Sequence, residues 1–201
     1  ACAYEPWFLR QIEEIVRDFV RDDPGNAMGA GSDEPAWGEP LVGFARGDDP
    51  LFDRYKEVIG EFHWAPQEAF ALAFPDAPAE PSELTVISYV LPQTAATKAD
   101  NRREMIYPSE RWARTRIFGE AFNVRLRERL AATLTAAGYD AVAPMLRSEW
   151  RSLDSERFVF ASTWSERHIA HAAGLGTFGL CDGLITPVGK AMRAGSVVAR
   201  I

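Results

Sequence analysis

The sequence has little cysteine and little histidine, and these shortages exclude several kinds of protein. Two cysteines among 201 residues, Cys2 and Cys181, cannot form the disulfide framework of a small secreted domain, and they fit a reducing cytoplasm. His168 and His171 are three residues apart on an expected helix, but no third ligand with clear spacing accompanies them, so no metal site is predicted. We interpret both histidines as structural or surface groups, and Cys181 as a small buried apolar residue.

Long apolar runs and an excess of basic charge are also absent. No apolar run reaches the roughly 18 residues that span a bilayer, and the first ten residues lack the basic and apolar regions of a signal peptide. The net charge of −7 argues against a general nucleic-acid surface, which needs a basic footprint. The arginines between residues 111 and 129 are interpreted as the solvated face of one helix. We therefore expect a cytoplasmic protein without a membrane or general nucleic-acid partner.

What the chain does contain fits one domain of residues 1–201 with mixed helix and strand. The strongest strand is expected over residues 84–91, which are β-branched, aromatic and apolar on both faces, as in the centre of a sheet. Residues 22–39 and 93–107 are polar and are expected to be loops. Periodicity, proline and capping residues predict helices over residues 6–21, 50–60, 66–74, 108–137 and 165–172.

Shorter strands are expected at residues 139–143 and 157–161, and a hairpin is expected from strands 184–186 and 196–201 with a turn near Pro187. Helices and strands alternate without the regularity of βαβ units. The fold class is therefore predicted as α+β, with a sheet flanked by helices. Thr163 and Glu166 have the spacing of a capping box, so Glu166 is expected to cap the helix that follows.

A cluster of three glycines, Gly174, Gly176 and Gly179, follows that helix. It matches G-x-G-x-x-G by letters, but the dinucleotide fingerprint follows a strand and opens a helix, so that reading fails. A phosphate-binding loop is excluded because no Gly-Lys-Ser/Thr occurs at the required spacing. Two readings remain open: a main chain that lies close to a flat or bulky ligand, or a tight connection with no ligand.

Four blocks in a fixed order carry a resemblance. They are WSERHIA at residues 164–170, AGLGTFG at 173–179, LITPVG at 184–189 and RAGSVV at 193–198. Together they resemble the epoxyqueuosine reductase and reductive dehalogenase group, which are cobalamin-dependent iron–sulfur proteins. The resemblance continues more weakly through residues 39–44 and 86–91.

The resemblance implies a nitroreductase-like α+β fold with a central sheet flanked by helices and a corrinoid, cobalamin, bound beside the sheet. The positions that it implies for cofactor binding are Gly174, Leu175, Gly176, Thr177, Phe178, Gly179, Thr186, Pro187 and Ser196. In relatives a ferredoxin-like segment with cysteine-bound 4Fe-4S clusters follows this region. Each cluster needs four thiolates, so two cysteines cannot hold one, and we expect a fragment or a chain without its cluster domain. An electron donor or a separate cluster domain is then the implied partner.

The resemblance does not extend to the residue that donates a proton. Epoxyqueuosine reductases carry an aspartate proton donor several residues before the Glu-Arg pair, and residues 158–162 contain no acid here. Glu166 is the candidate catalytic acid, with helix capping as its other role, and a dehalogenase-type tyrosine has no clear match besides Tyr107. Arg167 would orient a carboxylate or an amide, or form a surface ion pair with Glu166 or an earlier acid.

The expected function is that of a cofactor-binding domain in an oxidoreductase that acts on a small molecule. The alternatives are a non-catalytic corrinoid-binding or interaction module, and a flavin-binding protein of the nitroreductase type.

Overall fold

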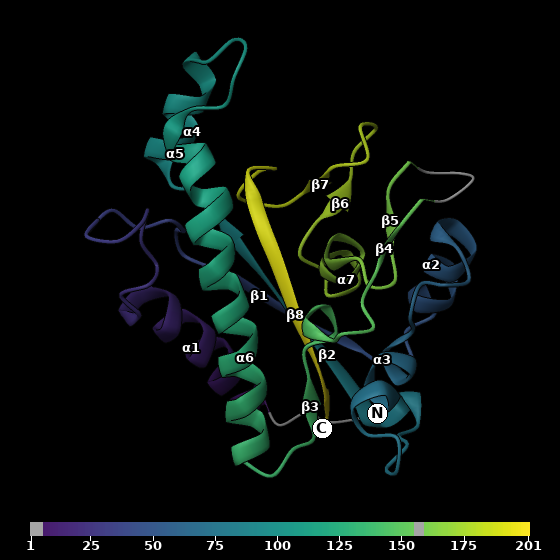
Figure 1. Ribbon diagram of the computed structural model, residues 1–201. Coiled ribbons are helices and arrows are strands. Elements are labelled where there is room, and N and C mark those ends of the chain that lie inside the picture. The colour runs from purple at the N-terminus through teal and green to yellow at the C-terminus, as the bar shows by residue number, and fades with distance from the viewer. Residues whose placement is uncertain (1–5, 155–158) are drawn as a thin grey trace.

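A four-stranded antiparallel sheet organises the chain in the computed structural model, which describes residues 6–154 and 159–201 (Figure 1). The strand order is β1-β2-β8-β3, and every neighbouring pair is antiparallel. The strands are β1 (Leu41–Arg46), β2 (Leu84–Pro92), β8 (Met192–Arg200) and β3 (Ala141–Val142). Helices lie on both faces of this sheet, which confirms the predicted α+β class.

Both central strands are buried on both faces, so their side chains divide between two cores. Ile87, Tyr89 and Leu91 of β2 pack with Val197 and Ala199 of β8 in one core. Leu84, Val86 and Val198 belong to the opposite core. This alternation is the period-two pattern of a strand. It confirms that residues 84–91 form the centre of the sheet, with every residue of β2 buried.

The two faces are covered by different helices (Figure 1). The helices α1 (Pro6–Asp22) and α6 (Glu120–Ala136) cover one face and fill the first core with an apolar stripe that includes Ile12, Val16, Phe122 and Leu126. The other face carries α2 (Leu51–Ile59), α3 (Pro66–Ala73) and α7 (Glu166–Ala172). Among the described residues, no helix has the length and apolar character needed to cross a membrane.

The helices predicted over 6–21, 50–60, 66–74, 108–137 and 165–172 are confirmed within two residues, and the one over 108–137 contains a π-helical turn that was not predicted. It consists of α5 (Glu110–Arg114), a π-helical turn (Thr115–Gly119) and α6. Trp37 lies against this turn and donates from its indole Nε1 to the Gly119 carbonyl (3.0 Å). A π turn inserts an extra residue into the helical ladder, and here it accompanies that indole contact.

The loop predicted over 93–107 is wrong, because it contains α4 (Ala95–Arg103). The Thr94 hydroxyl accepts a hydrogen bond from the Thr97 amide and caps the helix. Thr97 is the one buried residue of α4. A helix that packs so little apolar surface has no amphipathic stripe, so periodicity could not detect it.

The strand predictions were less accurate at the edges and for the hairpin. The strand β1 was not predicted, and the strand at 139–143 is shortened to β3. Residues 184–186 and 196–201 do not pair: β7 (Leu184–Ile185) pairs with β6 (Thr177–Phe178), and β8 pairs with β2. Residues 157–158 of the strand predicted at 157–161 lie outside the described residues, and β5 (Ala161–Ser162) pairs with β4 (Ser152–Leu153). Short 3-10 turns occupy Pro81–Glu83 and Pro144–Leu146.

Gly43 in β1 allows the end of α7 to lie directly on the sheet. A Cβ at this position would overlap the carbonyl oxygen of Ala173 and would crowd the side chain of Leu175. Backbone cannot yield as a flexible side chain can. We therefore expect Gly43→Ala to lower the free energy of unfolding by about 1–3 kcal/mol through overpacking.

Urea unfolding followed by circular dichroism measures this effect, and Gly38→Ala is the matched control. A Cβ at Gly38 would meet its nearest neighbour, Pro92, at an ordinary 3.7 Å, so this variant is expected to stay within about 0.5 kcal/mol of the parent. Equal stability of the two variants would contradict the packing argument.

Candidate functional site

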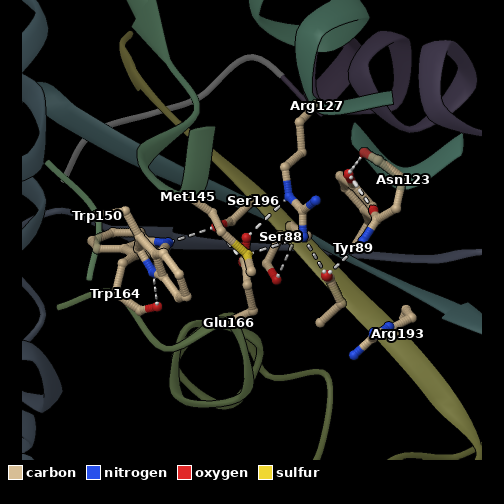
Figure 2. A network of polar contacts seen from close by, with 12 residues as sticks. Ser88, Tyr89, Asn123, Arg127, Met145, Trp150, Trp164, Glu166, Arg193 and Ser196 are labelled. Carbon is tan, nitrogen blue, oxygen red and sulfur yellow. Dashed lines mark hydrogen bonds and ion pairs between the residues drawn. The ribbon is translucent and has the colours of Figure 1, made fainter. Parts of the chain in front are cut away.

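A chain of buried polar contacts runs through the interior at the first turn of α7 (Figure 2). The Glu166 carboxylate accepts from the Ser196 hydroxyl at Oε2 (2.6 Å) and from Arg127 Nε at Oε1 (3.2 Å). Ser196 Oγ in turn accepts from the indole Nε1 of Trp164 (2.9 Å). The Glu166 side chain is only 11% exposed. Both carboxylate oxygens are therefore engaged, and α7 is tied to β8 through a charged group.

Arg127 comes from α6, on the other face of the sheet, and reaches Glu166 beside β8 (Figure 2). In the described part of the chain, β3 pairs with β8 only at Val198 and Ala199, so the earlier residues of β8 have no strand on that side. There the Ala194 carbonyl accepts from Arg127 Nη2 (3.0 Å) and from Asn123 Nδ2 (3.2 Å). These two side chains thus donate the hydrogen bonds that a neighbouring strand would otherwise supply to this carbonyl.

The prediction that the arginines of residues 111–129 form a solvated face is wrong for Arg127, which is buried. Helix spacing could have predicted this burial. Arg127 lies four residues after Asn123 and three before Leu130, on the buried stripe of α6. Burial acts to lower the pKa of its guanidinium, but Glu166, Tyr89 and Glu120 outweigh it and raise the pKa. Arg127 is therefore a buried cation held by carboxylates from two elements, Glu166 and Glu120.

Two cavities meet at this network and share Met145, Glu166 and Arg167 in their walls. The first, the tryptophan cavity, has a volume of about 320 Å³ and is lined by Trp150, Trp164 and His168 among others. The second, the arginine cavity, has a volume of about 400 Å³. Its charged wall contains Glu120, Arg127, Glu166, Arg167, Lys190 and Arg193. Both volumes suit a small organic ligand.

Three histidines and a tyrosine pack beside the tryptophan cavity. The Tyr55 hydroxyl is 2.7 Å from Nδ1 of His171, and the Ser165 hydroxyl is 2.8 Å from Nδ1 of His168. Burial lowers the pKa of His63 to about 3 and the pKa of His168 to about 4, with neighbouring positive charge adding to the effect. Within the described ranges, no three His, Cys, Asp or Glu side chains form a group that could hold a metal ion.

Two local predictions near this site are wrong. Ser165, not Thr163, precedes α7, and its side chain makes no capping hydrogen bond. Glu166 turns instead toward Arg127 and Ser196, because a buried cation is a stronger partner than an amide. Cys181 is exposed rather than buried. Its Sγ accepts from Lys190 Nζ (2.7 Å), and this contact lowers the pKa of the thiol.

Arg167 forms a surface ion pair, but its partner is Asp182 (3.3 Å), which lies later in the sequence than expected. Tyr107 is 78% exposed, and it lines none of the cavities described here.

The glycine cluster has a structural explanation at two of its three positions, Gly174 and Gly176. Gly174 follows the end of α7 with φ of +74°, a conformation that favours glycine after a helix. A Cβ at Gly176 would lie 2.5 Å from the Ile185 carbonyl oxygen, and one at Gly179 would lie 2.9 Å from the Ile185 side chain. The close approach of the Ile185 main chain therefore accounts for glycine at 176 whether or not a ligand is bound, whereas the end of the Ile185 side chain can move away from residue 179.

Four of the nine predicted cofactor-binding residues lie together. Gly174, Gly176, Thr177 and Pro187 line an open concavity with His171 and Ile185, which we name the glycine concavity. The other five lie elsewhere. Leu175 is buried in the core, Phe178 packs on the His168 ring, Gly179 lies against Ile185, Thr186 donates to the Gly189 carbonyl, and Ser196 is part of the buried network.

Two solved structures of epoxyqueuosine reductase are similar to this chain. One solved structure, from Bacillus subtilis, is 18% identical with a TM-score of 0.40, and a selenomethionine-labelled epoxyqueuosine reductase is 15% identical with a TM-score of 0.42. Each match covers 96% of this chain and 46% of the solved chain, so this chain spans about half the length of those proteins. No family model and no curated protein matches the sequence.

The side chains present fit the two implied cofactors differently. The residues that line the glycine concavity include no Asp, Glu, Lys or Arg, and a Cβ at Gly174 would meet nothing within 4 Å, so main chain is accessible there. Such a surface suits the neutral amide rim of a corrin ring. An iron–sulfur cluster does not fit, because it requires four thiolates and the whole sequence has two cysteines.

Proposed function

We propose that this chain is the cofactor-binding domain of a cobalamin-dependent reductase that acts on a small molecule. The observation that carries the proposal is the open glycine concavity, which has no Asp, Glu, Lys or Arg in its wall. All its lining residues except His171 belong to two of the four sequence blocks that resemble this group of enzymes. The same helix, α7, ends at this concavity and begins at Glu166, beside the two cavities. Cofactor and substrate would then occupy neighbouring surfaces of one helix.

When bound, a corrinoid supplies a cobalt centre for electron transfer, and the protein supplies orientation and electrostatics. Gly174 and Gly176 would let the main chain approach the ring amides, and the exposed Thr177 hydroxyl could exchange hydrogen bonds with them. Glu166 remains the predicted proton donor, although its hydrogen bonds from Ser196 and Arg127 favour a role in positioning Arg127. Arg127 would in turn present positive charge to the arginine cavity.

A non-catalytic corrinoid-binding module is the second candidate. The observation that favours it is the cysteine content, because this chain cannot hold the cluster that would deliver electrons. Both candidates require corrinoid binding. They differ in whether an added reductant changes the oxidation state of the bound corrinoid.

An anaerobic absorbance titration of the chain with hydroxocobalamin tests the shared requirement. We expect saturable binding in the range of tens of micromolar or tighter, because the concavity presents accessible main chain to a large neutral rim. Thr177→Arg places a long charged side chain in the concavity and is expected to weaken binding by about tenfold or more. Thr135→Arg, at an exposed position of α6, is the matched control and should bind as the parent does.

A parallel titration with flavin mononucleotide separates the nitroreductase-type alternative. Saturable flavin binding without corrinoid binding would replace the proposal by that alternative. No spectral change with either cofactor would overturn both.

A further inference from the structure

The arginine cavity has an excess of basic groups, although the protein as a whole is acidic. Four cations, Arg127, Arg167, Lys190 and Arg193, line it with only two carboxylates, Glu120 and Glu166. The chain carries a net charge of −7. A local excess of positive charge in an acidic protein marks a place where an anion gains electrostatic energy that it would not gain elsewhere on the surface.

Both carboxylates of this cavity are already occupied. Glu166 accepts from Ser196 and Arg127, and Glu120 Oε1 accepts from Arg127 Nη1 (3.2 Å). Arg127 also donates to the Ala194 carbonyl, so its guanidinium is fully engaged with protein groups. Glu120 is therefore shared between Arg127 and Arg193, and Arg167 pairs with Asp182. Lys190 contacts Cys181 and pairs with no carboxylate among the described residues.

Arg193 is only partly compensated, because it shares Glu120 with Arg127. Its Nε lies 3.0 Å from Glu120 Oε2. That approach does not have hydrogen-bond geometry, so this buried Nε has no hydrogen-bond partner among the described residues. Burial lowers the pKa of Arg193, and Arg116 and Arg127 lower it further against the opposing effect of Glu120. An anion beside Arg193 would offset both the burial and the repulsion.

The rest of the cavity wall is apolar. Met145, Leu184, Met192 and Ala194 contribute to it, and Leu184 is buried. Methionine side chains adapt to irregular apolar shapes and contact aromatic rings favourably. A ligand that fits the whole cavity therefore has a charged end and an apolar body, and a volume of about 400 Å³ is enough for such a molecule.

We propose that the arginine cavity binds a small organic anion, with Arg193 donating to its carboxylate or phosphate group and the methionine wall holding its apolar body. A guanidinium with free donors matches the paired oxygens of such groups. This site goes beyond the corrinoid proposal and does not depend on it, because its residues are separate from those of the glycine concavity.

Isothermal titration calorimetry of the full chain, without corrinoid and in a low-salt zwitterionic buffer, tests the site with four probes. Benzoate and benzamide have the same shape and differ in charge, phenyl phosphate exchanges the carboxylate for a phosphate, and inorganic phosphate lacks the apolar body. We expect benzoate or phenyl phosphate to bind at least about tenfold more tightly than benzamide and inorganic phosphate. The stronger of the two anions identifies which oxyanion the site prefers.

Arg193→Gln removes the charge and leaves a shorter, neutral polar side chain, and it is expected to weaken binding of the preferred anion by about tenfold. Arg129→Gln, at an exposed position of α6, is the matched control and should not change it. Arg193→Lys, which retains the charge, should recover part of the affinity. Equal affinity for benzoate and benzamide, or an unchanged affinity in Arg193→Gln with native circular dichroism, would overturn the proposal. A failure of hydroxocobalamin binding would leave these results unaffected.

Discussion

Replacing Arg127 with methionine is expected to lower the free energy of unfolding by about 3–5 kcal/mol, because it leaves the nearly buried Glu166 carboxylate without its cation. The Arg127 side chain is 2% exposed, and its partners Glu166 and Glu120 are 11% and 28% exposed. The substitution also removes one of the two donors to the Ala194 carbonyl. Urea unfolding followed by tryptophan fluorescence and circular dichroism measures the change.

A double-mutant cycle with Glu166→Gln shows whether the loss arises from the ion pair. The double variant should be about 1–3 kcal/mol more stable than the sum of the single effects predicts, because the second substitution removes the charge that the first left unpaired. Arg129→Met on the exposed side of α6 is the control and is expected to stay within about 0.5 kcal/mol of the parent. Additive effects in the cycle, or a small loss in Arg127→Met, would show that the network does not couple α6 to α7.

Acidification is expected to destabilise the protein well above the pH at which most carboxylates titrate, because the buried His63 and the half-buried His168 must become charged. Burial holds the pKa of His63 at about 3 and that of His168 at about 4, whereas an unfolded histidine titrates near 6.5. The unfolded chain therefore binds more protons below pH 6.5. As the pH falls from 6.5 toward 4, the free energy of unfolding therefore decreases by roughly 2–3 kcal/mol for each histidine.

Unfolding free energies measured at several pH values between 7 and 4 test this expectation. His63→Asn removes one titrating group, so the slope of stability against pH between pH 6 and 4 should decrease by up to about 1.4 kcal/mol per pH unit. His63→Asn combined with His168→Asn should reduce the slope in a second step. A slope that is the same in the parent and the double variant would mean that other groups cause the acid sensitivity.

Local sequence signals predicted the elements that pack against a core. The helix over residues 6–21 and the strand over residues 84–91 carry strong apolar patterns, and both exist as predicted. The helix α4 and the strand β1 were missed. The first buries a single threonine, and the second is a short strand interrupted by Gly43, where backbone approach replaces a side chain. Elements with little apolar surface leave little pattern to detect.

The site was predicted less well than the fold. The capping-box spacing correctly predicted that a helix starts near Glu166. Arg127 was predicted to be exposed with the other arginines, although its position on the buried stripe of α6 indicates burial. The pairing of β8 with β2 joins residues more than 90 positions apart, and no local signal contains such a partner. No local pattern predicted that Arg193 lines a cavity, because its environment is assembled from α6, α7 and β8.

The sequence by itself determined the α+β class, the central strand, the main helices and the inability of two cysteines to hold an iron–sulfur cluster. These depend on composition and on periodicity along the chain, which are local properties. Only the tertiary structure decided that Gly174 is needed by a helix end and Gly176 by a neighbouring strand, and that Glu166 holds a buried arginine instead of capping a helix. Charges and carbonyls from distant segments meet only after the sheet has formed, so their partners are set by packing and not by spacing.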